Sequence, residues 1–124
     1  MSSKKTSLKK DFTDILKKWR ESLDQPKNDI TRDSAILRFE LTFEVAWKLV
    51  QVLAREEGLE VNSPRKAFQE AFAMGWISDE EIWYDIIKAR NMAVHVYRQK
   101  LAEELYARLD RFYEAFGELH QHVN

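Results

Sequence analysis

Two rows of apolar side chains run along the segment from Asp29 or Thr31 to about Glu57. They limit the possible folds of the chain more than any other feature of the sequence. Steps of three and four place the members of each row on one face of an α-helix. One neighbouring helix cannot cover two such rows. We therefore expect a long helix that is either central in a helical bundle or partly buried in a partner chain. The first row contains Ile36, Phe39, Phe43, Ala46, Val50 and Leu53, and the second contains Leu37, Leu41, Val45, Leu49 and Val52.

Helical spacing of apolar residues also predicts the two helices that flank this one. The first helix is expected to begin near Thr6 or Ser7, either of which can cap it. Gly58 is expected to end the long helix. A short helix then follows Ser63-Pro64, since proline suits the first helical position.

Two further helices are predicted in the second half of the chain. Ser78 and Glu81 have the spacing of a capping box and are expected to open the fourth helix. The last helix is expected to include Leu101 to Leu119 and to be followed by a tail, His120 to Asn124.

No segment shows the alternation of a β-strand, so the predicted class is all-α. Short connections between helices favour antiparallel neighbours. The sequence therefore predicts an antiparallel up-down four-helix bundle with one additional short helix, in which residues 1–124 form a single helical domain.

Composition excludes several classes of protein. The formal net charge of −1 excludes a molecule that binds nucleic acid through its overall charge. The absence of cysteine excludes disulfides and thiolate metal sites. No apolar run approaches the ~20 residues of a membrane span, and the first residues lack the apolar core of a secretory signal. We therefore expect a soluble cytoplasmic protein that does not bind membranes.

Metal and cofactor binding are not expected either. Glu40 and Glu44 are spaced for one helix face, but a di-iron site would also need Glu-x-x-His motifs, which the chain lacks. The simpler interpretation is an ion pair between Glu44 and Lys48. No glycine-rich phosphate loop or carboxylate motif of a nucleotidyltransferase is present, so the chain itself is not expected to transfer nucleotides.

The candidate site lies in the stretch from Arg90 to Tyr97, where an arginine, an amide, a histidine and a phenol fall within eight residues. Arginine can grip a phosphate with two parallel hydrogen bonds. Histidine can donate or accept a proton near neutral pH. Arg90 and His95 could therefore act together on a phosphodiester, with Asn91 orienting a group and Tyr97 positioning one.

Helical geometry complicates this interpretation. Arg90 and His95 are five residues apart, which is about 140° around a straight helix. They can meet on one ligand only if the helix bends or ends between them, or if a second chain supplies its own copy. The alternative is purely structural: Arg90 and Asn91 would cap a helix end, and His95 and Tyr97 would be interface or half-buried residues.

The stretch resembles the Arg-x4-His-x-Tyr signature of HEPN domains. Arg38-Phe39-Glu40-Leu41-Thr42-Phe43-Glu44-Val45-Ala46-Trp47-Lys48 resembles the second-helix signature of the nucleotidyltransferase substrate-binding branch of that superfamily. Ser63-Pro64-Arg65 and the Arg90-Asn91 pair fit the same branch, and the similarity extends over nearly the whole chain.

The resemblance implies a helical bundle that forms a homodimer, with two copies of the signature facing a shared cleft. It also implies a partner protein, a separate minimal nucleotidyltransferase. The chain would then be the toxin of a toxin-antitoxin pair, a metal-independent ribonuclease acting on RNA and neutralised by that partner. Arg90 and His95 would be the catalytic pair, Asn91 an active-site polar residue and Tyr97 the target of adenylylation. The alternative that the resemblance allows is a non-catalytic subunit that binds substrate for the nucleotidyltransferase.

Overall fold

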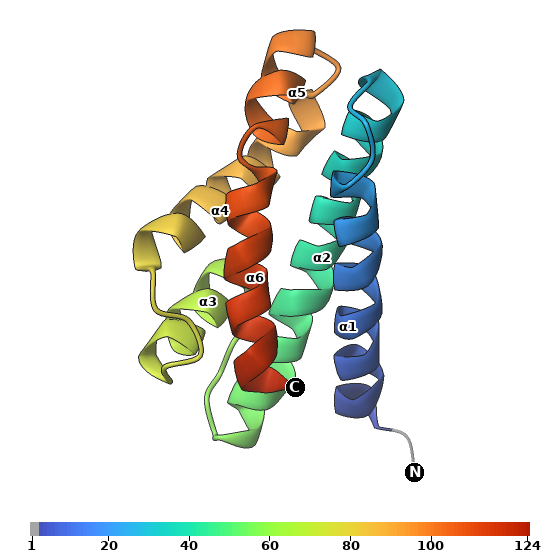
Figure 1. Cartoon of the computed structure of the whole chain (residues 1–124). Helices are drawn as coiled ribbons and strands as arrows, with labels where there is room; N and C mark the ends of the chain where they lie inside the picture. Colours follow the sequence, from blue (N-terminus) through green and yellow to red (C-terminus); the bar gives the residue numbers. More distant parts are fainter. Residues whose placement is uncertain (1–2) are drawn as a thin grey trace.

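The computed structural model describes residues 3–124, and they form helices joined by short connections (Figure 1). The elements are α1 (Lys4–Leu23), α2 (Asp29–Glu56), α3 (Pro64–Ala73), α4 (Glu80–Met92), the 3₁₀ turn η1 (Ala93–His95), α5 (Gln99–Tyr106) and α6 (Leu109–Val123). Residues 3–124 contain no strand, which confirms the all-α prediction. Within this part of the chain, no helix is both long and apolar enough to cross a membrane.

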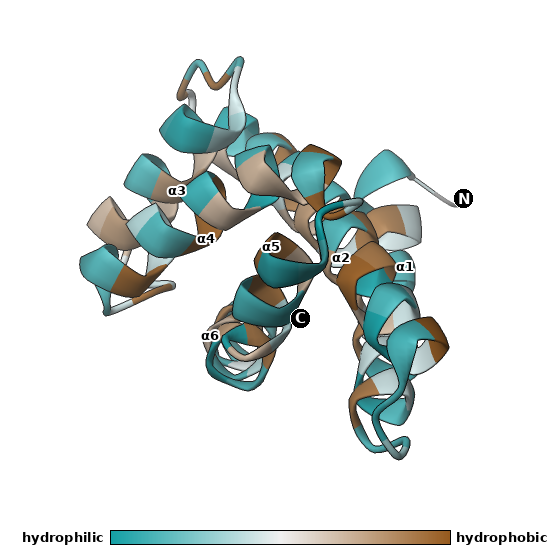
Figure 2. Cartoon of the chain, turned by 90° about the horizontal axis from the view of Figure 1, so that it is seen from above, coloured by the Kyte–Doolittle hydropathy of each residue, from teal (hydrophilic) through white to brown (hydrophobic). Residues whose placement is uncertain are grey.

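Helices α1, α2, α4 and α6 run alternately up and down in Figure 1, with α3 and α5 as the shorter additions. Figure 2 views the molecule from above, with α1 and α2 on one side, α3 and α4 on another, and α5 with α6 between them. An up-down bundle was predicted, but α5 is one short helix more than expected.

Side-chain caps set where the helices begin. Ser3 caps α1 by accepting a hydrogen bond from the Thr6 amide, so this helix starts slightly before the predicted position. Asn28 and Thr31 form a reciprocal capping box at the start of α2. Ser63 caps α3 as predicted. The end of α2 is also as predicted, because Gly58 takes the left-handed φ of +80° that follows many helices.

The predicted cap of α4 is wrong by one residue. Asp79, and not Ser78, accepts the hydrogen bond from the Ile82 amide, at 3.1 Å. The Ser78 hydroxyl instead donates to Glu118 on α6, at 2.8 Å. A carboxylate one residue further on is an equally good cap, and it leaves the serine available for a tertiary contact.

The core lies between α1, α2 and α6 and is rich in aromatic side chains. Trp19, Phe39 and Phe116 are all fully buried, and the Trp19 ring lies 5.8 Å from Phe39 and 5.6 Å from Phe116. Edge-on and tilted contacts of this kind stabilise aromatic clusters beyond the area that they bury. The first apolar row of α2 therefore forms the centre of the bundle, as its pattern predicts.

The second row of α2 is only partly covered. Leu49 is fully buried, and Val45 and Val52 are half-buried. Leu37 and Leu41 are 54% and 45% exposed. Residues 3–124 therefore cover only about half of the side-chain surface in the N-terminal half of this row, which we call the uncovered half of α2.

The last predicted helix is in fact two helices. The chain turns at Ala107 and Arg108, between α5 and α6, although neither residue is a glycine or a proline. The predicted tail is also wrong, because α6 continues to Val123, whose side chain is buried. His120 accounts for part of this order: its ring meets Phe12 edge-on and its Nε2 lies 2.8 Å from the Thr13 hydroxyl.

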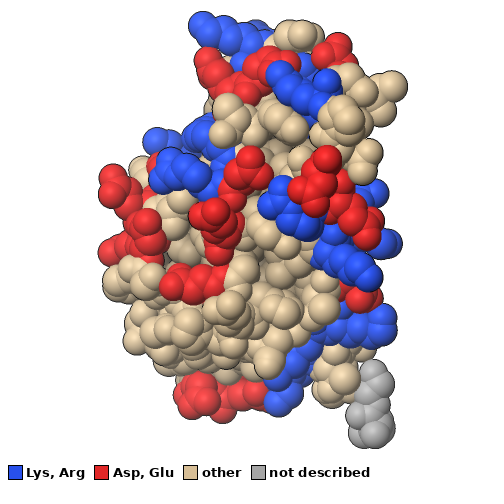
Figure 3. All heavy atoms as spheres, in the orientation of Figure 1, with Lys and Arg blue, Asp and Glu red and all other residues tan. Residues whose placement is uncertain are grey.

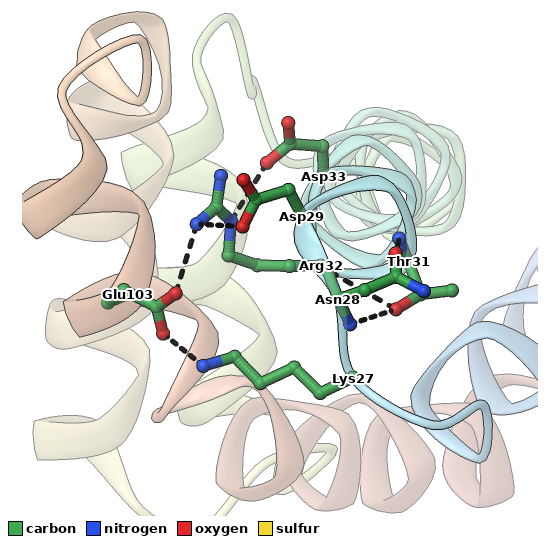
Figure 4. A network of polar contacts seen from close by, with 7 residues as sticks. All are labelled: Lys27, Asn28, Asp29, Thr31, Arg32, Asp33 and Glu103. Carbon is green, nitrogen blue, oxygen red and sulfur yellow. Dashed lines mark hydrogen bonds and ion pairs between the residues drawn. The ribbon is translucent and has the colours of Figure 1, made fainter.

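A cluster of charged groups joins the start of α2 to α5 (Figure 4). The Arg32 side chain is only 5% exposed, and its guanidinium pairs with Asp33 at 3.0 Å and Glu103 at 3.0 Å. Asp29 lies 3.4 Å away, and Lys27 forms a second ion pair with Glu103. We call this group the Arg32 cluster. It keeps the segment that follows η1 against α2.

Candidate functional site

The helix that carries Arg90 ends between Arg90 and His95. Arg90 and Asn91 lie on the last turn of α4, which stops at Met92. The chain then tightens into η1, with His95 as its last residue, and Tyr97 follows two residues later. The buried Ala93 side chain marks where this turn packs against the bundle. Arg90 and His95 therefore do not lie on one straight helix. The angle of about 140° expected between them on such a helix does not apply.

Arg90 projects from this helix end toward α2. Its Nη2 atom lies 2.7 Å from the Glu44 carboxylate, and its guanidinium lies 5.5 Å from the centre of the Phe43 ring. A charge-assisted hydrogen bond and a cation-π contact thus hold one side chain. The Arg90 side chain is still about two-fifths exposed, and only its Nη2 atom pairs with Glu44, so donors remain for a ligand.

A cavity of about 320 Å³ lies beside this ion pair, which we call the Arg90 groove. Side chains of α2 form one wall, and the end of α4 with the start of η1 forms the other. Its lining residues are Glu40, Leu41, Glu44, Arg90, Asn91 and Val94. Two carboxylates, a guanidinium and an amide therefore line this space together with the partly exposed apolar side chains of Leu41 and Val94.

The two carboxylates of the groove differ in their surroundings. Partial burial raises the pKa of the Glu40 carboxyl above its ordinary value, and the positive charge of Arg90 opposes that rise. Glu44 instead has direct partners: Arg90, the Trp47 indole N–H at 3.3 Å and the Lys48 ammonium at 3.8 Å. The groove can thus offer both hydrogen-bond donors and acceptors to a polar ligand.

His95 and Tyr97 lie outside this lining. Both are exposed, Tyr97 by 75%, and their rings meet edge-on with centroids 6.3 Å apart. The Arg98 guanidinium lies 5.9 Å from the Tyr97 ring. The structure therefore divides the four predicted site residues into two pairs, Arg90 with Asn91 in the groove and His95 with Tyr97 on the surface next to it.

Sequence reasoning missed the partner of Arg90. It paired Glu44 with Lys48 on one helix, and that contact exists, but the shorter ion pair joins Glu44 to Arg90 on another helix. Spacing along one helix reveals only local pairs. Residues 3–124 contain no group of three or more histidine, aspartate or glutamate side chains placed to hold a metal ion.

Comparison with known proteins adds an independent line of evidence. The model of a family described as "nucleotidyltransferase substrate binding protein like" matches residues 4–124. No protein with curated annotation matches the chain.

Two solved structures, among others, are similar to this chain. Protein ttk003001694 from Thermus thermophilus is 30% identical, with a TM-score of 0.85 over 91% of this chain and 98% of its own. HI0074 from Haemophilus influenzae is 23% identical, with a TM-score of 0.76 over 96% of this chain and 98% of its own. The HI0074 structure is described as revealing the fold of a substrate binding domain of a nucleotidyltransferase.

Proposed function

The chain belongs to the family of nucleotidyltransferase substrate binding protein-like chains, and from this premise we propose that it is the substrate-binding subunit of a two-component nucleotidyltransferase. The catalytic subunit is a separate minimal nucleotidyltransferase. In this pair the present chain holds the acceptor of the nucleotidyl group, and the partner supplies the transfer chemistry.

The observation that carries this proposal is the ion pair between Arg90 and Glu44, at 2.7 Å. An arginine that stabilises a cleaving phosphodiester must direct its charge at the phosphate. Here a carboxylate already neutralises that charge, and Glu40 adds a second acidic group to the same groove. Such a lining suits the recognition of a polar acceptor through several hydrogen bonds, with Arg90 and Asn91 donating and Glu40 accepting.

We also propose that the chain acts as a homodimer through the uncovered half of α2. Leu37, Leu41 and Val94 are 54%, 45% and 71% exposed, and Leu41 and Val94 also border the Arg90 groove. Apolar side chains grouped in this way are costly in water and mark interaction surfaces. A second copy on this surface would place two grooves beside one interface.

The proposal is tested by reconstitution. The chain is mixed with the minimal nucleotidyltransferase of the same organism, magnesium, labelled ATP and a small-molecule extract, and label transferred to small molecules is measured. Transfer is expected only when both chains are present. Arg90→Gln and Glu40→Gln should lower it at least about tenfold, a loss of one good hydrogen bond to a charged group.

Lys48→Gln is the matched control, because Lys48 is exposed beside the same ion pair but does not line the groove. It should leave transfer within about twofold of the wild type, as expected for an exposed ion pair. Transfer that is unaffected by the present chain, or equally affected by all three substitutions, would contradict the proposal.

A second candidate function is the metal-independent ribonuclease of a toxin-antitoxin pair. One observation favours it: α4 ends between Arg90 and His95, and His95 and Tyr97 are exposed to a large substrate such as RNA. In this case Arg90 and His95 are catalytic, and the partner neutralises the toxin by attaching AMP to Tyr97.

Expression without the partner separates the two functions. Wild type, His95→Ala and the control His122→Ala are compared for growth and for RNA integrity. A ribonuclease predicts poor growth and cleaved RNA for wild type and control only, whereas a substrate-binding subunit predicts intact RNA in all three. Mass spectrometry after incubation with the nucleotidyltransferase and ATP then shows whether Tyr97 carries AMP.

A further inference from the structure

A second cavity lies between α3 and α4 and is separate from the Arg90 groove. It has a volume of about 220 Å³ and lies where Gly75, with a φ of +77°, helps the chain to reverse between the two helices. Pockets for drug-sized ligands usually measure ~300–1,000 Å³, so this one fits a fragment of one or two rings.

Aromatic side chains form most of its walls. Phe68 and Trp83 are buried at its back, with ring centroids 4.5 Å apart at an interplanar angle of 32°. Phe72 and Tyr84 also line the cavity and are 40% and 52% exposed. These half-exposed rings leave flat apolar surface in water on the two helices. A flat ring that entered between them would remove that surface from water and stack on aromatic faces.

Polar groups complete the lining. Arg65 and Gln69 come from α3 and Glu80 from the first turn of α4, and all three line the mouth of the cavity. Together they offer donors and an acceptor to the edge of a ring. A ring with nitrogen or oxygen atoms on its edge fits this arrangement better than a plain hydrocarbon.

The cavity is a neighbour of the Arg90 groove. The Phe43 ring contacts Arg90 on the groove side, at 5.5 Å, and Phe68 on the cavity side, also at 5.5 Å. Along α4, Ile87 lines the cavity and Asn91, one turn further, lines the groove. The two sites are therefore neighbours along one face of α4, separated in the interior by the buried Phe43 and Phe68 rings.

We propose that the cavity between α3 and α4 binds a flat heteroaromatic ring of one or two fused rings. The identification of this ring as part of the nucleotidyl acceptor rests on the proposed function. Binding of the ring itself does not require the partner protein.

The test uses the chain alone and two probes, indole and benzimidazole, with cyclohexanol as a non-aromatic control of similar width. The Trp83 indole N–H is the reporter, because Trp83 lines the cavity and its N–H has no hydrogen-bond partner among the described residues. The ring current of an aromatic ring bound in the cavity should shift the NMR signals of the Trp83 side chain. Assignment comes from Trp→Phe variants at the four tryptophans, Trp19, Trp47, Trp76 and Trp83. We expect a saturable shift of this signal with a Kd at or below about 1 mM.

Phe72→Ala and Tyr84→Ala remove half-exposed rings and are not expected to unfold the chain. Each substitution should raise the Kd for indole and benzimidazole about tenfold, because it removes the free energy of one aromatic contact. Ile30→Ala is the control, because Ile30 is 81% exposed at the start of α2 and does not line the cavity. It should leave the Kd unchanged.

The proposal is overturned if neither probe shifts the Trp83 signal, if cyclohexanol shifts it equally, or if both aromatic variants bind as the wild type does. Its failure is distinct from that of the proposed function, which the reconstituted transfer measures. Ring binding without nucleotidyl transfer would support the cavity and contradict the proposed function.

Discussion

Single residues in the Arg90 groove have properties that their sequence neighbours do not reveal. Glu40 sits on the α2 face that turns toward Arg90, partly removed from water. Burial raises the pKa of the Glu40 carboxyl and so favours its neutral form, whereas the positive charge of Arg90 favours its charged form. The protonation of Glu40 therefore depends on both its burial and the charge of Arg90 across the groove.

Glu40→Gln is expected to change how stability depends on pH. Burial raises the folded-state pKa of Glu40 above its unfolded value, so the folded chain binds more protons, and this contribution to stability is lost as pH rises through the folded pKa. The variant should therefore gain stability relative to wild type as pH is raised above the ordinary glutamate range, measured by urea unfolding at several pH values.

Glu104→Gln, at an exposed position on α5, is the control for that titration. In an Arg90→Gln background, Glu40→Gln should change the pH dependence of stability more than it does in the wild type. The reason is that Arg90→Gln removes the charge that lowers the pKa of Glu40. A pH profile of Glu40→Gln that runs parallel to the wild type would contradict this account.

The elements are held in place by contacts between distant segments as well as by their own helical patterns. The Arg32 cluster joins the start of α2 to α5 (Figure 4), and α5 directly follows the segment that carries His95 and Tyr97. Lys27 and Arg32 together lower the pKa of the Glu103 carboxyl. This cluster thus fixes the far side of the candidate site.

Arg32→Ala is expected to destabilise the chain by about 1–3 kcal/mol, because Arg32 is almost completely buried and its partners lose their counter-charge. Amide hydrogen exchange should accelerate most in α5 and η1. Lys66→Ala removes the ion pair of a half-exposed lysine with Glu70 on α3 and should cost less than about 1 kcal/mol. Equal losses in the two variants, measured by urea unfolding, would show that burial of Arg32 contributes nothing.

The sequence predicts the elements well where apolar rows and caps agree. The bounds of α2 and the start of α3 follow from such patterns. It does not predict the end of α4 inside the site or the turn at Ala107 and Arg108, because no glycine or proline marks either place. Contacts between segments distant in the sequence, such as the ion pair of Arg32 with Glu103, are not visible in local patterns. The partner of Arg90 is hidden for the same reason, since Glu44 is far from it in the sequence.

The face of the molecule seen in Figure 3 carries charges of both signs, and both signs occur on the α1 side as well as on the opposite side. The net charge is −1. Long-range electrostatic attraction therefore says little about which partners the molecule binds. The exposed apolar side chains in the uncovered half of α2 are more informative about an interaction surface.

Leu41→Glu is expected to turn the proposed homodimer into a monomer. A buried leucine contributes ~1.5–3 kcal/mol, and a carboxylate in its place adds a desolvation cost, so the dimer should weaken at least about 100-fold. Phe72→Glu, at a similarly exposed apolar position on α3, should leave the dimer intact. Sedimentation at micromolar concentration checks both. A monomeric wild type, or dissociation only in Phe72→Glu, would argue against this surface.

The position of α6 has a consequence for how the chain acquires its structure. Phe112 and Phe116 of α6 contact Phe39 of α2, and Phe116 also contacts Trp19 of α1. On the ribosome, α1 and α2 are made first and can pair locally, but their largest rings stay uncovered until α6 has been synthesised. The nascent pair of α1 and α2 is therefore the stage at which this chain is most open to misassembly, and its core is complete only after α6 has been made.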